Sequence, residues 1–464
     1  MGIVDRVDGT RAEGSHTLRS SWLQSAPDPP VHPHAPATEA PPPTDGAAAD
    51  NPGPAPGSTA LRTLFPALTA DGPVYLDSAA TTQKPLPVID AVTDYHRHHT
   101  ANSGRGTYSW ATTLTTAVEQ IRVDTAHFLG AHAHEVVFTG GATAALNAVA
   151  LGWGLTALTD GDEILYSPRD HASNVHPWLR LRDTLAHFGR HIRLIPYRTT
   201  ALGEADLTDI AAKIGPRTRL LTLSHLHHVY GALSTPQQSA ELLPERALLC
   251  LDCTQSAGHL PIDVRALGAD FAVLAAHKMF GSPGTGVLFC HERIHDQLGP
   301  FLPGGNSAVH VQDSALVPDH MPHRMEGGTH NLPGILALGA ALRMLRDIGT
   351  DRIADHNRIL TRRLVDGMRD LPGLRILPGP AHASDGAGYG IVSFTLDAIT
   401  ATDLGFVLAE LGLLVRTGAH CVPTTPHPAP GESDSVRVST HAYTTTEEID
   451  RFLDCLTTIA TEVR

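Results

Sequence analysis

The chain has 464 residues, of which 42% are hydrophobic and 18% are charged, and its formal net charge is -14. This length predicts two or three globular domains. Because the chain is acidic and has no dense basic run, we expect neither nucleic acid nor an anionic membrane as a partner. Its longest apolar stretch, residues 404–415, contains Glu410 and is shorter than the ~20 residues of a membrane span.

Prolines gather near the start of the chain, where residues 27–56 hold 11 of the 35. Such a segment cannot bury enough apolar surface to offset its conformational entropy. We therefore expect residues 1–60 to be a disordered extension rich in proline and alanine. An inert linker is favoured over a docking arm for a partner.

From Leu61 onward, short apolar runs alternate with longer amphipathic stretches, which is typical of an α/β fold. Most runs are apolar throughout, as in strands that helices cover on both faces of a mostly parallel sheet. Helices are expected between them, for example over residues 143–154 and 239–246. The expected strands are residues 135–140, 162–167, 192–197, 219–225, 247–252, 271–277 and 286–290.

Two domains are expected after the extension. The first is a large cofactor-binding domain over residues 61–345, whose N-terminal segment packs on the second. The second is a smaller α/β domain over residues 346–464, with strands near 390–396 and 435–440 and a closing helix over 445–463.

The turn Gly140–Gly141 follows an expected strand and opens an expected helix. Glycines let backbone N–H groups approach an anion, and the helix N-terminus adds partial positive charge. The turn is a candidate phosphate cradle, although ordinary turn chemistry also explains two adjacent glycines.

Two further strands end in residues that carry chemistry. Asp252 ends an apolar run, where a carboxylate is costly unless it meets a positive group such as a protonated heteroaromatic nitrogen. A helix cap is the other explanation for this residue. Lys278 ends the next run, where burial favours the neutral amine that a Schiff base requires, although the side chain could instead emerge into solvent. Together with the glycine turn, these are the parts of a pyridoxal 5'-phosphate (PLP) site.

The five cysteines are unevenly spaced, and one of them has a reactive setting. Cys421 follows His420 directly and lies five residues after Arg416, and neighbouring cations favour the thiolate. The other four lie in apolar runs, as small hydrophobic residues do: Cys250, Cys253, Cys290 and Cys455. An odd number of cysteines without an export signal indicates reduced thiols and a cytoplasmic location. The 29 histidines form no HExxH pattern, and we expect no metal.

Taken together, the ordered motifs resemble the class V aminotransferase-like PLP enzymes, and most closely the SUF-type cysteine desulfurase and selenocysteine lyase group. The resemblance covers residues 61–464. The matching segments are YLDSAATTQKP (75–85), RGTYS (105–109), VVFTGGATAALN (136–147), RDHASNVHPW (169–178), LDCTQSAGH (251–259), HKMFGSPGTGVL (277–288), EGGTHN (326–331), VRTGAHC (415–421) and RVST (437–440). The resemblance implies the PLP-dependent transferase fold of type I, with a mostly parallel central sheet in the large domain.

The resemblance also implies the roles of individual residues. Lys278 would bind PLP covalently, Asp252 would pair with the ring nitrogen, Gln255 would contact the ring hydroxyl, and His171 would stack on the ring and take part in catalysis. Further cofactor contacts would come from Ala142, Thr143, His277 and His228, and from Thr329 of the other subunit of a homodimer. Arg437 would hold the substrate carboxylate, with Ala80 also at the substrate. Cys421 would accept sulfur, with Arg416 supporting its loop.

The sequence departs from the family pattern at three positions. Ala275 stands where a serine hydroxyl usually meets the phosphate, His228 stands where an asparagine is usual, and Tyr108 stands where a histidine is frequent. His228 could bond the ring hydroxyl, act as an acid or base, or only fill the space of the amide.

These features predict a PLP-dependent cysteine desulfurase. It would convert L-cysteine, or a related amino acid, to L-alanine with a persulfide on Cys421, which a sulfur-acceptor protein could then receive. The departures leave a second class V activity open, as a C–S lyase or β-eliminase or an amino-acid epimerase in specialised metabolism. A non-enzymatic scaffold is the least favoured, because Lys278, Asp252 and Arg437 are all present.

Overall fold

The computed structural model describes residues 53–463 except 105, 313, 380–387 and 424–432. The chain divides into two units, Met1–Asn51 and Pro52–Arg464. Of residues 1–60, which were expected to be disordered, residues 1–52 lie outside the described residues. Residues 53–60 belong to the second unit: the N–H of Gly53 donates to the carbonyl of Asp347 at 3.0 Å and that of Gly57 to Ala442 at 2.6 Å. The division at residue 345 stays a prediction.

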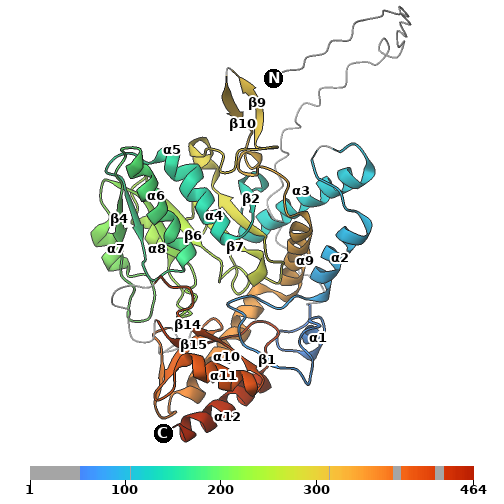
Figure 1. The fold of residues 1–464 in the computed structure, drawn as a ribbon, viewed down its shortest axis with the longest axis vertical. Helices are drawn as coiled ribbons and strands as arrows, with labels where there is room; N and C mark the ends of the chain where they lie inside the picture. Colours follow the sequence, from blue (N-terminus) through green and yellow to red (C-terminus); the bar gives the residue numbers. More distant parts are fainter. Residues whose placement is uncertain (1–52, 105, 313, 380–387, 424–432, 464) are drawn as a thin grey trace, which may run out of the picture. The chain divides into compact units, whose positions relative to one another are not determined.

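Within the described residues, the main sheet has seven strands in the order β2-β8-β7-β6-β5-β3-β4 (Figure 1). Each expected run forms one of them. All neighbours run parallel except at β8, which is antiparallel to both β2 and β7. The bounds are β2 (Val136–Thr139), β3 (Glu163–Tyr166), β4 (Arg193–Pro196), β5 (Thr218–Ser224), β6 (Leu248–Asp252), β7 (Phe271–Ala275) and β8 (Gly286–Cys290). The mostly parallel α/β sheet is therefore confirmed.

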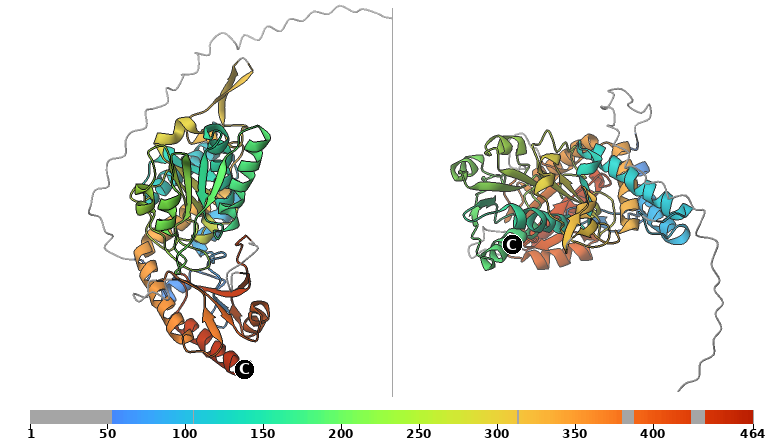
Figure 2. Two further views of the ribbon diagram at one scale, coloured as in Figure 1. Left: turned by 90° about the vertical axis from the view of Figure 1, so that its left-hand side faces the viewer. Right: turned by 90° about the horizontal axis from the view of Figure 1, so that it is seen from above.

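Both faces of this sheet are buried, which explains the uninterrupted apolar runs. Successive strand residues alternate between two cores: Leu249 and Leu251 point into one, whereas Leu248 and Cys250 point into the other. Figure 2 shows helices on either side of the sheet. The first core packs against α2 (Leu86–His98), α3 (Ser109–Leu129) and α9 (Leu332–Ile348), and the second against α4 (Ala142–Ala148) and α6 (His176–His187).

One expected helix has other bounds in the structure. Over residues 239–246 the structure instead has α8 (Pro236–Glu241), which starts earlier and ends before Pro244. Proline disfavours helical geometry in the residue before it, so the apolar pattern does not continue as helix. The expected helix at 143–154 does form, as α4 followed by the wider π-helical turn Val149–Gly154. The remaining short helices are α1 (Thr59–Arg62), α5 (Leu155–Ala157) and α7 (Leu207–Lys213).

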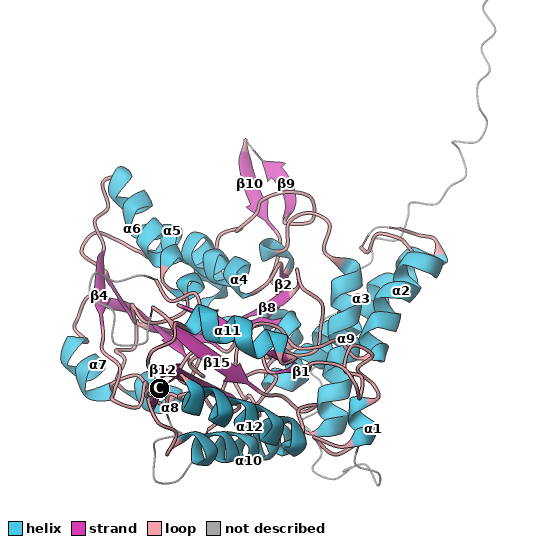
Figure 3. Ribbon diagram, turned by 60° about the horizontal axis from the view of Figure 1, so that its bottom comes forward, coloured by secondary structure: helices cyan, strands magenta, loops and turns pink. Residues whose placement is uncertain are grey.

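The C-terminal elements surround a second, antiparallel sheet with the order β11-β12-β15-β14. Figure 3 shows α10 and α12 lying side by side against it. The strands are β11 (Leu374–Ile376), β12 (Ile391–Leu396), β14 (Arg416–Gly418) and β15 (Ser435–Ser439), and the helices are α10 (Thr350–Met368), α11 (Ala401–Glu410) and α12 (Thr446–Glu462). The N-terminal segment joins this region through β1 (Val74–Tyr75), which pairs in parallel with β13 (Leu413–Leu414).

A hairpin of β9 (Ala308–Gln312) and β10 (Ala315–Pro318) projects from the end of the unit opposite the small sheet (Figure 1). It carries exposed apolar side chains at Val311 and Leu316. Among the helices described here, we find none with the length and apolar character needed to cross a bilayer.

Candidate active site

A cavity of about 330 Å³ lies at the carboxyl ends of β5, β6 and β7, between the main sheet and the small sheet. In a parallel sheet these strand ends meet at one edge, which is where ligands bind. All but one of the predicted site residues line it: Ala80, Ala142, Thr143, His171, His228, Asp252, Gln255, His277, Lys278, Arg416, Cys421 and Arg437. The exception is Thr329, which is exposed and lies outside this lining.

Lys278 enters the cavity from a 3-10 turn, Ala276–Lys278, that directly follows β7. The side chain is buried, and no described carboxylate forms an ion pair with it. Burial, and after it the positive charge of Arg437, lowers the pKa of its amine to about 8, while the charge of Asp252 opposes the shift. The smaller neutral fraction that this pKa leaves near physiological pH can act as a nucleophile and a base.

Asp252 ends β6 at the floor of the cavity, and its Oδ1 accepts the N–H of Thr254 at 3.0 Å. The carboxylate is buried, yet no cationic side chain among the described residues pairs with it. Gln255 donates its amide to the carbonyl of Ala79 at 2.9 Å, which leaves its Oε1 buried without a described partner. Both groups therefore retain unused capacity to bind a ligand.

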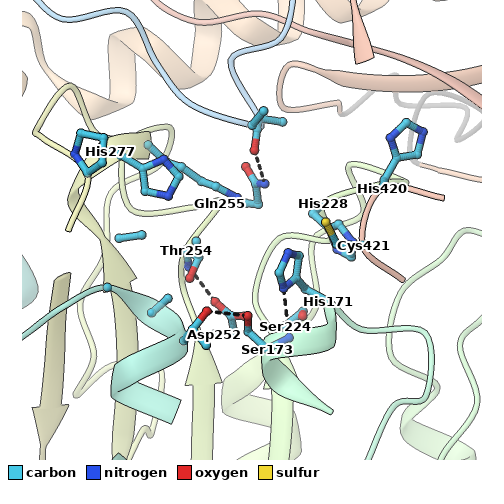
Figure 4. Close-up of a pocket in the computed structure, with 18 of the residues that line it drawn as sticks. His171, Ser173, Ser224, His228, Asp252, Thr254, Gln255, His277, His420 and Cys421 are labelled. Carbon is cyan, nitrogen blue, oxygen red and sulfur yellow. Dashed lines mark hydrogen bonds between the residues drawn. The ribbon is translucent and has the colours of Figure 1, made fainter. Parts of the chain in front are cut away.

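His171 is held in one orientation at the centre of the cavity (Figure 4). Its Nδ1 accepts the N–H of Ser173 at 3.1 Å, so the neutral ring carries its proton on Nε2. Burial lowers the pKa of this imidazole to about 4, with Lys278 adding to the shift. The ring is therefore a neutral, flat surface at physiological pH.

Small and hydroxyl groups line the end of the cavity beside α4. Gly141 precedes this helix at φ +133°, a conformation that a side chain would oppose, and the free helix N–H groups follow it. The hydroxyls of Thr143 and Ser173 lie 2.7 Å apart. Ala275 offers no hydroxyl here, but the buried Thr285 lines the same cavity. Together these groups form a cradle for an anion.

His277 and His228 lie on opposite sides of the cavity (Figure 4). Burial lowers the pKa of His277 to about 4, so its imidazole is neutral. Burial, followed by the charges of His227 and His171, also holds the pKa of His228 well below its usual 6.5. The His228 ring stacks on His227 at 4.9 Å, and its Nε2 is buried without a described partner. The third departure, Tyr108, is exposed at the start of α3, outside this lining.

Arg437 lies on β15 and is held by two hydrogen bonds. Its Nη1 donates to the carbonyl of His228 at 2.9 Å, and its Nη2 donates to Oδ1 of Asp77 at 3.2 Å. Burial lowers its pKa to about 10, and its Nε has no partner among the described residues. Arg416 lies directly opposite it on β14. Two guanidinium groups on adjacent strands form a strongly cationic wall that suits a carboxylate.

Cys421 lies at the solvent-facing edge of the cavity, and its side chain is exposed. Nη2 of Arg416 donates to its Sγ at 3.4 Å. Both His420 (φ +50°) and Cys421 (φ +65°) adopt the left-handed conformation, which is strained for residues with a side chain. The segment is held because the Cys421 carbonyl accepts the N–H of Ala172 at 2.9 Å and because Nε2 of His420 contacts Oγ of Ser435 at 3.0 Å.

Sequence reasoning missed several residues of this site. Asp77 orients Arg437. A buried guanidinium needs a carboxylate partner, and this need could have prompted a search for an acidic residue such as Asp77. Ser173 fixes the ring of His171 and could have been found as the residue two positions after that histidine. Thr254 and Thr285 carry no signal in the sequence that separates them from ordinary turn residues.

The groups present fit PLP. The cavity combines a buried carboxylate without a cation, a buried amine of lowered pKa, a fixed neutral ring and an anion cradle. These match the pyridine nitrogen, the aldehyde, the ring and the phosphate of that cofactor. A separate group, His134, Glu135 and Glu292, has spacing suited to a metal ion, but Glu135 already accepts from Arg265 at 2.5 Å.

Comparison with known proteins places this site in a family. A family model described as aminotransferase class-V matches residues 74–452. A cysteine desulfurase of Klebsiella pneumoniae is 36% identical over 384 residues, which cover 82% of this chain and 91% of that protein. A probable cysteine desulfurase of Methanothermobacter thermautotrophicus is 34% identical over 83% of this chain and 94% of its own.

Solved structures agree with this placement. The apo structure of a cysteine desulfurase from Thermococcus onnurineus has a TM-score of 0.79 at 29% identity, and it covers 86% of this chain and 97% of that one. The cysteine desulfurase CsdA of Escherichia coli has a TM-score of 0.77 at 29% identity, with 87% and 98% covered. The family model, the curated relatives and the solved structures all indicate the same family, and the chain belongs to the aminotransferase class-V family.

Proposed function

We propose that this protein is a PLP-dependent cysteine desulfurase, which converts L-cysteine to L-alanine and leaves a persulfide on Cys421. The activity named for the curated relatives supports this proposal. One observation carries it: the thiol of Cys421 lines the same cavity as the amine of Lys278 and the guanidinium of Arg437.

Six residues would hold the cofactor, five by noncovalent contact and one by a covalent bond. Asp252 would face the pyridine nitrogen, Gln255 the ring hydroxyl and His171 the ring face, while Thr143 and His277 would contact the phosphate. Lys278 would bind the cofactor covalently through its amine. When bound, PLP supplies an electron sink for bonds broken next to the substrate α-carbon.

Substrate binding would use the cationic wall. Arg437 would receive the carboxylate of L-cysteine, because its guanidinium is buried, is oriented by Asp77 and has an Nε donor with no partner in the described part of the chain. Ala80 lines this region with a side chain small enough to leave room for the substrate. Lys278, once released from the cofactor, would move the proton of the substrate α-carbon, since its lowered pKa suits a base near neutral pH.

Sulfur transfer would take place at the edge of the cavity. The thiolate of Cys421, beside the Arg416 guanidinium, would attack the substrate sulfur. A new S–S bond forms, the carbon–sulfur bond breaks, and the substrate β-carbon gains a proton. L-cysteine and the Cys421 thiol thus become L-alanine and the Cys421 persulfide, with no additional oxidant or reductant.

We also propose a homodimer in which Thr329 of each subunit completes the other subunit's phosphate site. Support comes from the position of Thr329, which is exposed and does not line the cavity of its own chain. Exposed apolar side chains at Trp110, Leu302 and Val311 also support an interface. A mixture of the K278A and T329A variants tests this. Subunit exchange should restore activity above that of either variant alone, and sedimentation should show two chains per particle.

An acceptor thiol, on a small molecule or an acceptor protein, would then take the sulfur. The exposure of Cys421 supports direct access from solvent. We place the activity in the cytoplasm, where cysteine thiols stay reduced.

Mass spectrometry after incubation with L-cysteine tests the activity. Cys421 should gain the mass of one sulfur atom, and a reducing thiol should remove it. The C421A variant should lose alanine release, whereas C455A, which removes another partly accessible free cysteine, should keep it. Undiminished alanine from C421A would contradict the proposal. Pyruvate as the main product would favour a β-eliminase. Conversion of L-cysteine to D-cysteine would favour an epimerase.

A further inference from the structure

The carbonyl of His277 receives an unusual number of hydrogen-bond donors. Nζ of Lys84 donates to it at 2.9 Å, the N–H of Thr82 at 3.0 Å, and the hydroxyls of Thr81 and Thr82 at 3.0 Å and 3.1 Å. This carbonyl belongs to the peptide bond that joins His277 to Lys278. Donors from a segment 193 to 196 positions earlier in the chain therefore fix the backbone immediately before Lys278.

The same segment also holds the backbone after Lys278. Oγ1 of Thr82 accepts the N–H of Phe280 at 2.9 Å. Phe280 is fully buried at φ +69°, a conformation that residues with a side chain seldom adopt. Because Thr82 bonds on both sides of Lys278, it closes a clamp around the turn that carries this amine.

The hydrogen bonds of the Lys84 ammonium in the described structure all go to Thr81, Thr82 and His277. Its ammonium donates to the carbonyl of Thr82 at 2.6 Å and to that of His277, and it forms no ion pair with a carboxylate among the described residues. Burial lowers its pKa to about 8, so keeping a charge here carries an energetic cost. A cation held at a cost against a carbonyl next to Lys278 indicates a role in positioning that residue.

Composition supports the need for an ammonium group. Only three of the 34 basic residues of this chain are lysines, namely Lys84, Lys213 and Lys278. An ammonium is compact and directs its donors tetrahedrally, whereas guanidinium is a planar fork. In a chain that otherwise uses arginine, a lysine at position 84 fits a site where a compact donor must reach two carbonyls.

We propose that Lys84 is a positioning residue whose ammonium group, together with Thr81 and Thr82, fixes the peptide between His277 and Lys278 and thereby directs the Lys278 amine into the cavity. The backbone part of this inference stands on the structure alone. Its consequence for cofactor capture rests on the proposed function.

Hydrogen exchange of the apoprotein tests the backbone part. The amides of Met279, Phe280 and Gly281 report on the turn, because the first and last donate to Ala276 and the second to Thr82. In K84M they should exchange about tenfold faster, as expected when a hydrogen bond from a charged donor is lost, while amides of β5 and β12 stay unchanged.

The matched control is K213M. Lys213 also donates to a backbone carbonyl, that of Pro196 at 2.6 Å, but it ends α7 and makes no hydrogen bond to the turn at Lys278 among the described residues. Its loss should leave exchange at residues 279–281 unaltered. Unchanged exchange at these amides in K84M, or an equal increase throughout the molecule, would overturn the proposal.

Cofactor capture gives the second measurement. Added PLP should form its covalent bond with apo K84M about tenfold more slowly than with the wild type, followed by absorbance, and reduction with borohydride should fix it on Lys278. If K84M does not fold, T82V and T82S replace it: the first should behave as predicted for K84M, and the second should restore the wild-type rate. A wild type that never captures PLP would refute the proposed function but leave the exchange result standing.

Discussion

Arg416 and Cys421 are joined by a hydrogen bond of 3.4 Å from the Nη2 of the guanidinium to the sulfur. The two residues are five positions apart, and the chain between them turns through the left-handed conformation at His420. A permanent cation is thereby placed against a thiol that faces solvent. The guanidinium is thus positioned to donate a charge-assisted hydrogen bond to this sulfur as it reacts.

The R416M variant should therefore lower the reactivity of Cys421. We expect its alkylation by iodoacetamide to slow by about tenfold, the effect of removing a charge-assisted contact. Cys455, which is partly buried in α12 and for which no hydrogen bond from a guanidinium is found among the described residues, serves as the reference thiol in the same sample. Equal rates at Cys421 in wild type and variant would show that the guanidinium does not activate this sulfur.

Asp170 should make the stability of the apoprotein depend on pH. Burial, and then the charge of Asp252, raise the pKa of this carboxyl from 3.8 to about 7. The folded state thus holds the proton more tightly than the unfolded state. The contribution of Asp170 to the free energy of unfolding is fully present below about pH 4 and is lost as the pH rises through about 7.

The D170N variant removes this titration. Its urea midpoint should rise relative to the wild type between pH 5 and pH 8, because folding the wild type then requires Asp170 to take up a proton or, above about pH 7, to be buried as an ionised carboxylate. D183N is the control, since Asp183 is exposed on α6 beside Arg182. A constant difference between D170N and wild type across this range would contradict the shifted pKa.

Much of this site follows from rules that operate along the chain. Strands buried on both faces read as apolar runs, and parallel strands place their ends together, so Asp252 and Lys278 could be assigned to one site. The pairing of Arg437 with Asp77 could not be assigned in this way. These residues are 360 positions apart, and their contact depends on how the first strand and the small sheet align. The same is true of Lys84 and the carbonyl of His277. Both residues lie in segments that the sequence analysis singled out, but their contact could not be predicted from the sequence.

A buried ion pair should dominate the stability of the segment that carries Thr329. Arg122 donates to both carboxylate oxygens of Glu326, at 2.6 Å and 3.0 Å, and one of these oxygens also accepts the N–H of Phe138. Both side chains are almost inaccessible to solvent. Glu326 lies three residues before the exposed Thr329, so the pair anchors the chain next to that residue in the core.

The R122M variant leaves the buried Glu326 carboxylate without its guanidinium partner, so that, of the described residues, only the imidazoles of His323 at 3.8 Å and His330 at 3.5 Å remain within ion-pair distance. Its free energy of unfolding should fall by about 3–5 kcal/mol, which urea denaturation of the apoprotein measures. R182M, which removes an exposed pair with Asp183, should cost less than about 1 kcal/mol. A similar small loss in both variants would mean that Glu326 finds another partner.

His228 should act as a neutral hydrogen-bonding group toward a bound ligand. Its side chain lines the cavity, its Nε2 has no partner among the described residues, and its pKa lies well below 6.5 because of burial. H228F keeps a flat ring and removes both nitrogens, whereas H228N keeps a polar group. We expect H228F to weaken PLP binding to the apoprotein by about 3–10-fold, the value of one neutral hydrogen bond, and H228N to retain most of the affinity. The difference should stay constant from pH 6 to pH 8, since the ring does not titrate there. Fluorescence titration with PLP measures it, and a variant H228F that binds as tightly as the wild type would show that this ring only fills space.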